Sequence, residues 1–518
     1  MKKLISSLIL IAILSTACTT PAATGPVEAT VAGIPATSLK STLDVESPVE
    51  MTATPEISVK PFTLRESFTD LAVVNDYTLA VEKLVGESGS DMVIDVTAYS
   101  PDGRYVAYGG CTGNWSGHCQ NDTFGPSDSF IYILDARTSE LVASLPENKT
   151  TISGLSFSSD GNKLAYATSP AKVAVWDIPS GSVDIVLWQK DDGSSYGKVA
   201  FSPDSKSVAF VFDDSLYVWA YPGGELLTQS PAFWYALDFP QFSADGKRLA
   251  VFTQNYGKAL AVYDTDTWQV ISKITAPGNG AHRAALSPDG LLLVTAEGKD
   301  GADIYLWDAD TGEQVGILEE PLEAILAMTF TPDGQLLFVS GYSLASGQED
   351  TFSIWDMANR QYLGGMIFEN EPSRIIFSAD GLTFFDNTHL WAQADASILA
   401  ARQVLVDYNA ALTRGDYDAA AALFLDSDDA LTWYKDAGYD TSNIPDMLAA
   451  VCASSVEMCL PFKTVRNGGR DRWGDYEFFV QRTNLDGSVY IDDDGFLHIW
   501  LNVVPDANGN FKVIGYPL

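Results

Sequence analysis

The chain has 518 residues, of which 46% are hydrophobic, so it is long enough for two folded units with their own cores. Its 68 acidic residues outnumber its 31 basic residues and give a formal net charge of -37. A surface this acidic repels phosphate backbones and anionic headgroups, which argues against nucleic-acid binding and against membrane attachment through a basic patch.

Residues 1–17 predict an export signal. Two lysines precede an apolar run over residues 4–14, which is too short to be a permanent membrane span. The stretch that ends at Cys18 resembles the lipobox of bacterial lipoproteins, with Leu14 one position further from the cysteine than is usual. The resemblance implies that Cys18 carries a lipid and becomes the mature N-terminus. Ordinary signal cleavage, which would leave a free cysteine, is the alternative.

Residues 18–62 predict a disordered tether, because they are rich in Pro, Ala, Thr and Ser and show no sustained hydrophobic period. With a lipid on Cys18, such a tether would hold the folded part away from a membrane. We therefore expect a lipid-anchored, extracytoplasmic protein of the cell envelope. The other four cysteines form two pairs that are close in sequence, Cys111 with Cys119 and Cys452 with Cys459, and predict two local disulfides.

Residues 63–393 contain a turn signature that occurs seven times: Ser or Thr, one variable residue, Asp and usually Gly. Pro at the second position suits a type I turn, and Gly suits the exit from it. The turn aspartates lie 41 to 58 residues apart, a period typical of four-stranded propeller blades. They are Asp102, Asp160, Asp204, Asp245, Asp289, Asp333 and Asp380. Seven signatures predict seven blades.

The third predicted strand of most repeats ends in an aromatic residue and Asp, as in Trp307-Asp308 and Trp355-Asp356. These residues resemble the WD-repeat family in its divergent bacterial members. The resemblance implies a β-propeller and leaves the function open. The family's Gly-His dipeptide before each first strand is absent, so its His-to-Asp hydrogen-bond network is not carried over. No fourth strand follows Trp391, and we predict that residues 79–86 supply it and close the ring.

Residues 395–518 change to a helical period, with Ala401, Leu405, Tyr408 and Leu412 on one face and Gly415 ending the helix. Alternating strands are expected at 475–483, 488–492, 496–504 and 511–516. Residues 408–420 resemble the opening of nuclear-transport-factor-2-like domains, which implies a small α+β cone. The predicted fold is therefore mainly β, a seven-bladed propeller followed by this domain.

Signals of catalysis are weak. The four histidines have no metal-ligand spacing, and no nucleophile elbow follows a strand. Zinc at Cys111, His118 and Cys119 lacks a fourth ligand, and a calcium loop beginning at Asp308 has Glu313 where the EF-hand pattern needs Gly. His498 lies on an aromatic strand face and is more often structural there than catalytic. We expect no metal and no cofactor.

One position of the innermost strands, four residues before the turn Ser or Thr, is basic in three repeats. These residues are Lys198, Arg283 and Arg374, and we expect them near the top of the ring. They either pair with acids on neighbouring blades, such as Asp95 and Asp238, or bind a carboxylate or phosphate. In the second case Trp115, Trp234 and Tyr342, from loops of the top face, would form a rim.

The sequence therefore favours a membrane-anchored recognition or assembly module that binds a protein, peptide or saccharide on the top face of the propeller. A hydrolase of the lactonase kind, or an isomerase in the C-terminal cone, is the alternative.

Overall fold

The computed structural model describes most of the chain between residues 71 and 514, and the fold is stated for the ranges 71–77, 92–112, 128–148, 150–169, 172–189, 197–212, 215–231, 240–253, 259–278, 280–296, 303–320, 322, 324–342, 352–366, 374–455, 459–470, 475–484, 488, 490 and 498–514. The predicted signal and tether, residues 1–62, lie outside these ranges. None of the helices described there is long and apolar enough to cross a membrane.

The described chain is mainly β, with six four-stranded antiparallel sheets that we number in chain order. Sheets 1 to 3 contain β2 (Met92–Tyr99), β3 (Tyr105–Thr112), β4 (Asp128–Asp135) and β5 (Leu141–Asn148); β6 (Thr151–Phe157), β7 (Lys163–Ser169), β8 (Lys172–Asp177) and β9 (Ser182–Gln189); and β10 (Gly197–Phe201), β11 (Ser207–Phe212), β12 (Ser215–Ala220) and β13 (Leu226–Pro231).

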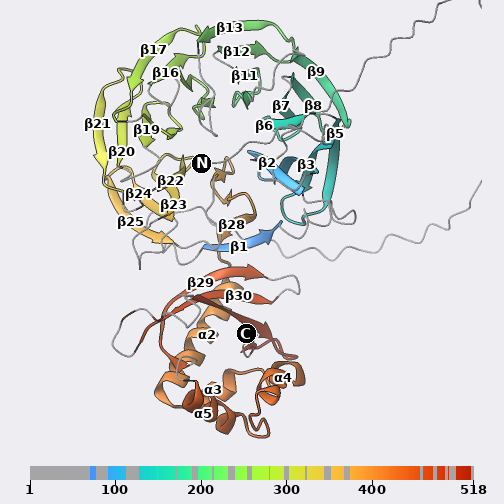
Figure 1. Ribbon diagram of the computed structural model, residues 1–518, viewed down its shortest axis with the longest axis vertical. Helices are drawn as coiled ribbons and strands as arrows, with labels where there is room; N and C mark the ends of the chain where they lie inside the picture. The colour runs from blue at the N-terminus through green and yellow to red at the C-terminus, as the bar shows by residue number, and fades with distance from the viewer. Residues whose placement is uncertain are drawn as a thin grey trace, which may run out of the picture. The chain divides into compact units, whose positions relative to one another are not determined.

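Sheets 4 to 6 contain β14 (Gln241–Phe242), β15 (Arg248–Phe252), β16 (Ala259–Asp264) and β17 (Val270–Thr275); β18 (Arg283–Leu286), β19 (Leu292–Ala296), β20 (Ile304–Asp308) and β21 (Gln314–Leu318); and β22 (Ala324–Phe330), β23 (Leu336–Tyr342), β24 (Phe352–Asp356) and β25 (Gln361–Met366). Figure 1 shows the sheets following one another around a common centre, each with its last strand outermost.

The predicted turns between the first two strands of each sheet are confirmed. In the first of them the Ser100 hydroxyl donates to Asp102 (2.7 Å) and accepts the N–H of Tyr105 (2.8 Å), and Gly103 has φ 73°. The other six turns repeat the Ser or Thr to Asp hydrogen bond at 2.6 to 2.7 Å. In sheet 3 the position of the glycine is held by Ser205, which adopts the same left-handed conformation with φ 56°.

Each sheet shares a buried apolar cluster with the next. Sheets 1 and 2 share one around Trp176, sheets 2 and 3 one around Phe210, and sheets 4 and 5 one around Phe252. The clusters continue in the same way between sheets 3 and 4 and between sheets 5 and 6. All six residues of β11 are buried, because a middle strand is covered by neighbouring sheets on both faces.

A further sheet, of eight strands, follows these six. It contains β26 (Ile376–Phe377), β27 (Thr383–Phe385) and β28 (His389–Gln393), followed by the N-terminal strand β1 (Leu71–Asp76), which pairs antiparallel with β28. We call these four strands sheet 7. Phe384 packs with sheet 6, whereas Phe385 packs with Tyr77 and Tyr108 of sheet 1, so sheet 7 contacts both the last and the first sheet.

The predicted range of the closing strand was wrong. An N-terminal strand does pair with β28, but it is residues 71–76, and all of residues 79–86 lie outside the described ranges. The other edge of β1 pairs in parallel with β29 (Phe462–Arg470) through Ala72 and Asn467. The strand is therefore internal to a larger sheet and needs apolar residues on both faces, as Leu71 and Ala72 provide. Residues 79–86, with Glu82 and Lys83, instead suit an exposed outer strand.

The outermost strands of sheets 1 to 6 have a common irregularity. Each contains a β-bulge just after the turn that precedes it, for example at Val142 in β5 and Val315 in β21. A bulge twists an edge strand and interrupts its row of hydrogen-bonding groups, which protects an exposed edge from pairing with another chain.

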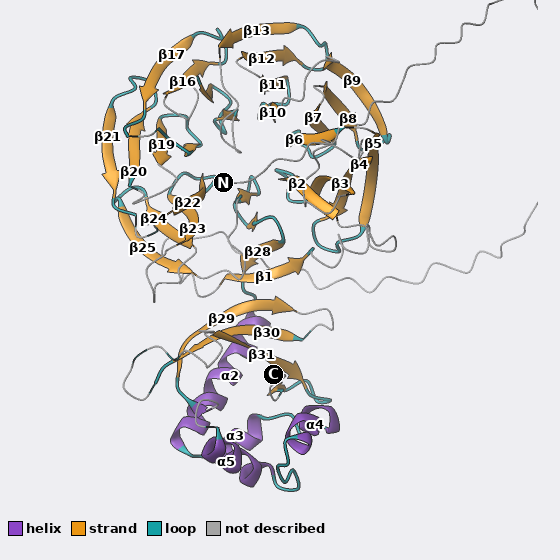
Figure 2. Ribbon diagram, viewed as in Figure 1, coloured by secondary structure: helices purple, strands orange, loops and turns teal. Residues whose placement is uncertain are grey.

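The C-terminal region contains, within the described residues, α2 (Ala396–Arg414), α3 (Tyr417–Leu423), α4 (Asp428–Asp436), α5 (Ile444–Ser454), then β29, β30 (Tyr476–Arg482), β31 (His498–Pro505) and β32 (Phe511–Val513). Figure 2 shows the helices lying against these strands. The predicted end of the first helix is confirmed, since Gly415 is its C-cap with φ 71°. The buried face of α2 includes Ala401, Leu405, Tyr408 and Leu412, as predicted.

The Cys452–Cys459 disulfide is present, with 5.5 Å between the Cα atoms, and joins the end of α5 to the segment before β29. For the other predicted pair, Cys111 is buried in β3 and Cys119 lies outside the described residues.

Candidate binding site at the innermost strands

The three basic residues singled out above lie at the start of innermost strands. Lys198 is the second residue of β10, Arg283 is the first residue of β18, and Arg374 precedes β26 by two residues. All three are half-buried. They come from sheets 3, 5 and 7, so no two of them belong to neighbouring sheets.

Each basic side chain crosses to the innermost strand of a neighbouring sheet. Lys198 Nζ donates to the carbonyl of Ser153 in sheet 2 (2.9 Å). Arg283 Nε donates to the carbonyl of Leu326 in sheet 6, and its Nη1 donates to His282 O (2.9 Å). Arg374 Nη1 donates to the carbonyl of Thr97 in sheet 1. The basic residues thus join three seams of the ring.

The accepting strands explain two of the three contacts, those of Lys198 and Arg283; Thr97, the acceptor of Arg374, keeps its regular pairing with Tyr108. β6 has a bulge between Ile152 and Gly154, and β22 has one between Ile325 and Ala327, so Ser153 and Leu326 are the extra residues. A bulged residue lacks its place in the hydrogen-bond ladder, and a charged donor stabilises such a carbonyl more than a neutral one does. The spacing of the repeats predicted the position of the basic residues. It did not predict the bulges in the neighbouring sheets that provide the accepting carbonyls.

The remaining parts of the predicted site lie largely outside the described residues. Trp115, Trp234 and Asp238 are outside them altogether, and of Asp95 and Tyr342 only the backbone is described. Pairing with acids and a rim of aromatic residues therefore both stay predictions.

Two acids that the sequence analysis missed, the half-buried Glu320 and the buried Asp386, bind the tryptophans of the third strands. Glu320 accepts hydrogen bonds from Trp355 Nε1 (2.8 Å) and from the Ser353 hydroxyl (2.8 Å), and burial raises the pKa of its carboxyl. Asp386 accepts from Trp391 Nε1 (2.7 Å). Burial raises the pKa of Asp386, but the hydrogen bonds and charge of His389 outweigh burial and hold it below its ordinary value.

The group that accepts the hydrogen bond of the third-strand tryptophan differs between the sheets. In sheet 5 the corresponding Trp307 Nε1 donates to the Thr295 hydroxyl instead (2.8 Å). The signal in the sequence was an acid four residues before a first strand, at Glu320, or between the second and third strands, at Asp386. Their full hydrogen bonding to the protein marks them as structural rather than as acids that act on a substrate.

Across the part of the chain that the structure describes, no three His, Cys, Asp or Glu side chains come together as a metal site. The Asp308 carboxylate accepts the N–H groups of Asp310 and Thr311 (3.1 and 2.8 Å), as in a hairpin turn. His498 pairs through its backbone with Gln481, and its side chain lies outside the described set.

Comparisons with known proteins agree with the fold. No family model matches the chain. It is 24% identical over 313 residues to autophagy-related protein 16 of Arabidopsis thaliana, and this match covers 50% of this chain and 61% of that protein. It is 30% identical over 119 residues to WD repeat-containing protein SL1-17 of Schistosoma mansoni, which covers 23% of this chain and 33% of that protein. The chain thus spans less than two thirds of either relative.

The match to a WD-repeat protein and the series of four-stranded antiparallel sheets together fit a WD-repeat-like β-propeller. In this class the fold alone does not specify a ligand, so function has to be argued from surfaces and side chains.

Proposed function

We propose that the chain is a membrane-tethered protein-interaction module, built as a seven-bladed propeller with a small C-terminal α+β domain of the nuclear-transport-factor-2-like kind. Sheet 7 serves as the seventh blade, because it contacts both sheet 6 and sheet 1. The similarity to a WD-repeat protein and to an autophagy-related protein supports protein partners.

The observation that carries the proposal is the placement of Lys198, Arg283 and Arg374 at one level of the innermost strands, half-exposed in a strongly acidic chain. A guanidinium can bind two carboxylate oxygens at once, and the bonds to neighbouring carbonyls hold each side chain in a fixed direction. The ligand at this level is an acidic group of a peptide, a protein or a saccharide.

The interaction site is tested with the Arg283→Ala and Arg374→Ala variants and a titration of acidic peptides and acidic sugars, followed by calorimetry. We expect each variant to weaken a true ligand by about tenfold, which corresponds to one charge-assisted hydrogen-bond pair. Arg283→Lys keeps the charge and controls for the bond to Leu326 O, and Arg137→Ala removes an exposed arginine elsewhere. We call the site formed by Lys198, Arg283 and Arg374 the inner-ring site. Unchanged binding in both alanine variants would reject it.

The tether is a separate part of the proposal and rests on the stretch that ends at Cys18. In a bacterial host, metabolic labelling with a fatty acid should mark the wild type and leave Cys18→Ser unlabelled and soluble after export. Equal membrane recovery of both proteins would reject lipid anchoring without bearing on the inner-ring site.

A further inference from the structure

The seven turns at the far end of the innermost strands are not equivalent. In sheets 1 to 4 the turn aspartate is bound, through Oδ2, by the side chain two residues later: Asp102 by Arg104, Asp160 by Asn162 (3.0 Å), Asp204 by Lys206 (3.4 Å) and Asp245 by Lys247 (3.4 Å). In sheets 5 to 7 that position holds Leu291, Gln335 and Leu382 instead. Among the described residues nothing binds Oδ2 of Asp289, Asp333 or Asp380, although Oδ1 keeps its turn hydrogen bonds.

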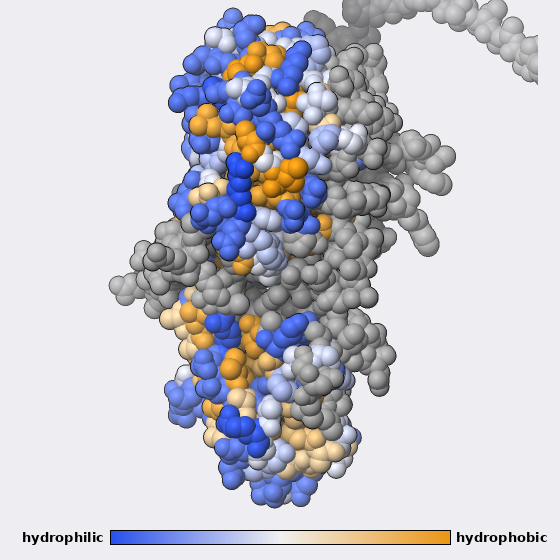
Figure 3. Space-filling model, turned by 90° about the vertical axis from the view of Figure 1, so that its left-hand side faces the viewer, coloured by the Kyte–Doolittle hydropathy of each residue, from blue (hydrophilic) through white to orange (hydrophobic). Residues whose placement is uncertain are grey.

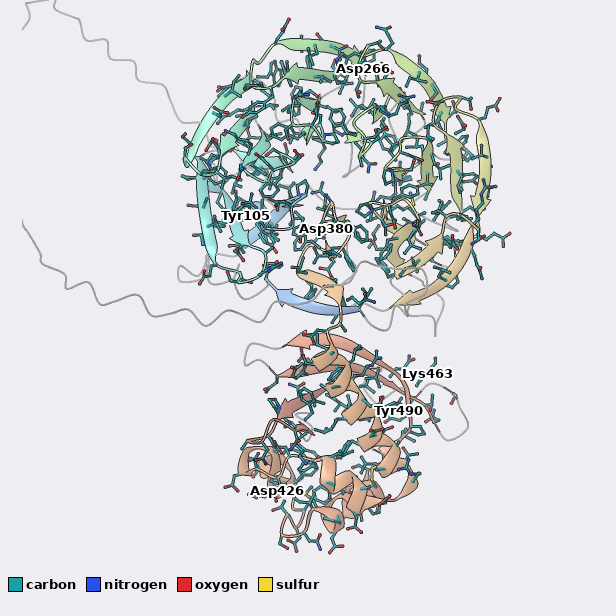
Figure 4. All side chains as sticks on the ribbon, turned by 180° about the vertical axis from the view of Figure 1, so that it is seen from behind. Tyr105, Asp266, Asp380, Asp426, Lys463 and Tyr490 are labelled. Carbon is teal, nitrogen blue, oxygen red and sulfur yellow. A yellow bond between two sulfur atoms is a disulfide. The ribbon has the colours of Figure 1, made fainter. Side chains whose placement is uncertain are left out.

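The inner turns lie toward the middle of the ring, and the turns before the outermost strands lie further out. Figure 4 shows this for Asp380, in an inner turn of sheet 7, and for Asp266, in an outer turn of sheet 4. The inner turns of sheets 5 to 7 are contiguous: a Cβ on Gly334 would lie 3.5 Å from Pro288, and one on Gly381 would lie 3.6 Å from Pro332.

Sheet 5 adds exposed apolar side chains to this acidic arc. Leu291 is 54% exposed, the highest value among the large hydrophobic residues that the structure describes. Its carbonyl accepts the N–H of Ala309 (2.9 Å), which places it beside the turn that leads into β21. On β21, Val315 and Ile317 are 40% and 46% exposed. Figure 3 faces this side of the ring and shows hydrophobic residues interleaved with hydrophilic ones.

Acidic residues flank these three apolar side chains in the sequence: Asp289 lies two residues before Leu291, and Glu313 and Glu319 stand directly before and after β21. Asp289, Glu313 and Glu319 are exposed, and none of them forms an ion pair with another described residue. Three cations of the neighbouring sheets lie close to this region. Arg360 Nη1 donates to Val315 O (2.8 Å), and Arg248 pairs with Asp310 (3.0 Å). The exposed Lys273 lies beside the outer turn of sheet 5, since a Cβ on Gly312 would be 2.8 Å from Lys273 O. We call Leu291, Val315, Ile317, Asp289, Glu313 and Glu319 the sheet 5 surface.

We propose that the sheet 5 surface binds a basic amphipathic segment of a partner protein. The three aliphatic side chains would bury apolar area against the apolar face of the segment, and the flanking carboxylates would pair with its lysines or arginines. The chain's net charge of -37 attracts a basic partner and repels a second copy of the same chain. Arg283 begins the first strand of sheet 5, whereas Leu291 follows the turn at the other end of that strand, so this surface is distinct from the inner-ring site.

The test uses the full-length chain and three fluorescent peptides of about 18 residues. The first is an amphipathic Leu/Lys peptide, the second has the same composition in an order without an apolar face, and the third replaces Lys by Glu. Anisotropy titration at low and high salt gives the affinities. The Leu291→Lys variant copies the residue that sheet 4 has at this position, Lys247, and should therefore fold.

We expect the amphipathic basic peptide to bind at least tenfold more tightly than the other two, with affinity falling as salt rises. Leu291→Lys and the pair Val315→Thr with Ile317→Thr should each weaken it by about tenfold. The matched control is Val183→Thr with Val186→Thr on β9, where the side chains are 37% and 47% exposed, and it should stay within about twofold of wild type.

Four results would overturn the proposal. The amphipathic basic peptide could fail to bind, the β9 pair could weaken it as much as the sheet 5 variants do, or Leu291→Lys could leave its affinity unchanged while the thermal unfolding profile stays that of wild type. A dimer in sedimentation that Leu291→Lys dissociates would also overturn it, because the occupant would then be a second copy.

Discussion

Sheets 1 to 6 are each built from one continuous stretch of chain, whereas sheet 7 takes β26, β27 and β28 from residues 376–393 and its outermost strand from residues 71–76. The outermost strands of the two kinds of sheet also differ in their exposure and pairing. In sheets 1 to 6 the outermost strand is exposed and has a bulge near its start, while β1 has a bulge at Val74 and is also paired with β29.

The difference shows where this protein concentrates its long-range interactions. A continuous sheet can lose an outer side chain and keep its remaining strands in register. Sheet 7 depends on contacts between segments about 300 residues apart, which are expensive in loop-closure entropy and have to be offset by dense packing. Tyr77, just after β1, is fully buried between Tyr108 and Phe385, with ring centroids 6.2 and 5.7 Å away.

The comparison predicts its largest effect at Tyr77. Tyr77→Ala should lower the free energy of unfolding by about 4 kcal/mol, because it removes a fully buried ring at the joint between sheets 7 and 1. Val270→Ala on β17, where the side chain is 40% exposed, should cost less than about 1 kcal/mol. Urea denaturation followed by tryptophan fluorescence measures both. Equal losses would show that sheet 7 is no more critical than the others.

How far the sequence could predict this fold follows from the range of each interaction. The turns were predictable because Ser100, Asp102 and Gly103 satisfy one another within four residues, and the same holds in each repeat. Helix α2 was predictable for the same reason, since its cap at Gly415 is local. The middle strands were predictable from their apolar composition, because neighbouring sheets cover both faces.

The closing strand was not predictable, because its character depends on β29. That strand was missed: it contains Asn467 and two glycines, a combination typical of turns, and it has a bulge at that point. Without β29 the outermost strand of sheet 7 was expected to be exposed and amphipathic. At the candidate site, likewise, the level of Lys198 and Arg283 was predictable from the repeat, but their acceptors, Ser153 O and Leu326 O, exist because of bulges in other sheets.

A second prediction concerns the buried acid of sheet 7. The Asp386 carboxylate accepts the N–H groups of Thr388 (3.0 Å) and His389 (2.7 Å) as well as Trp391 Nε1 (2.7 Å). Asp386→Asn keeps the shape but loses the charge and one acceptor oxygen, so it should cost about 2 kcal/mol at neutral pH. The pKa of Asp386 is lower in the folded protein than its ordinary value, so its stabilisation is present above about pH 4 and is lost as pH falls through the folded pKa.

Measuring unfolding free energies between pH 7 and pH 3 tests this. The difference between wild type and Asp386→Asn should shrink as the pH falls. A difference that stays constant would mean that Asp386 acts through its shape alone, and sheet 7 would then owe nothing to this charge.

Sheet 6 should show the opposite pH dependence, which sharpens the contrast between neighbouring sheets. Burial raises the pKa of Glu320 in the folded protein, against three hydrogen bonds that lower it. The folded state therefore holds the proton more tightly than the unfolded state, and stability falls as pH rises from about 4 through the raised pKa. In Glu320→Gln this loss is absent, so the variant should gain relative to wild type as the pH rises. The same denaturation series measures it, and a parallel pH profile would contradict the assignment.

The smallest effect is expected at the inner turns, where sheets of both kinds have the same geometry. Ser205 in sheet 3 has φ 56°, a conformation that costs a non-glycine residue about 1 kcal/mol, but its hydroxyl accepts the N–H of Ser159 in sheet 2 (2.9 Å). Ser205→Gly removes both terms and should change the free energy of unfolding by less than about 0.5 kcal/mol.

At Ser205 the backbone strain and the hydroxyl hydrogen bond nearly cancel, and Gly161→Ala is the matched control, because there the backbone strain and a clash have the same sign. Its φ is 66°, and the new Cβ would lie 2.7 Å from Asp102 Oδ2, so backbone strain and a clash with a fixed carboxylate add up to about 2 kcal/mol. Thermal and urea unfolding of the two variants measure the difference. If Ser205→Gly instead destabilised the protein as much as Gly161→Ala does, the hydroxyl bond between sheets 2 and 3 would outweigh the backbone strain. The inner turns would then stabilise the ring through contacts between sheets, as Tyr77 does at its closure.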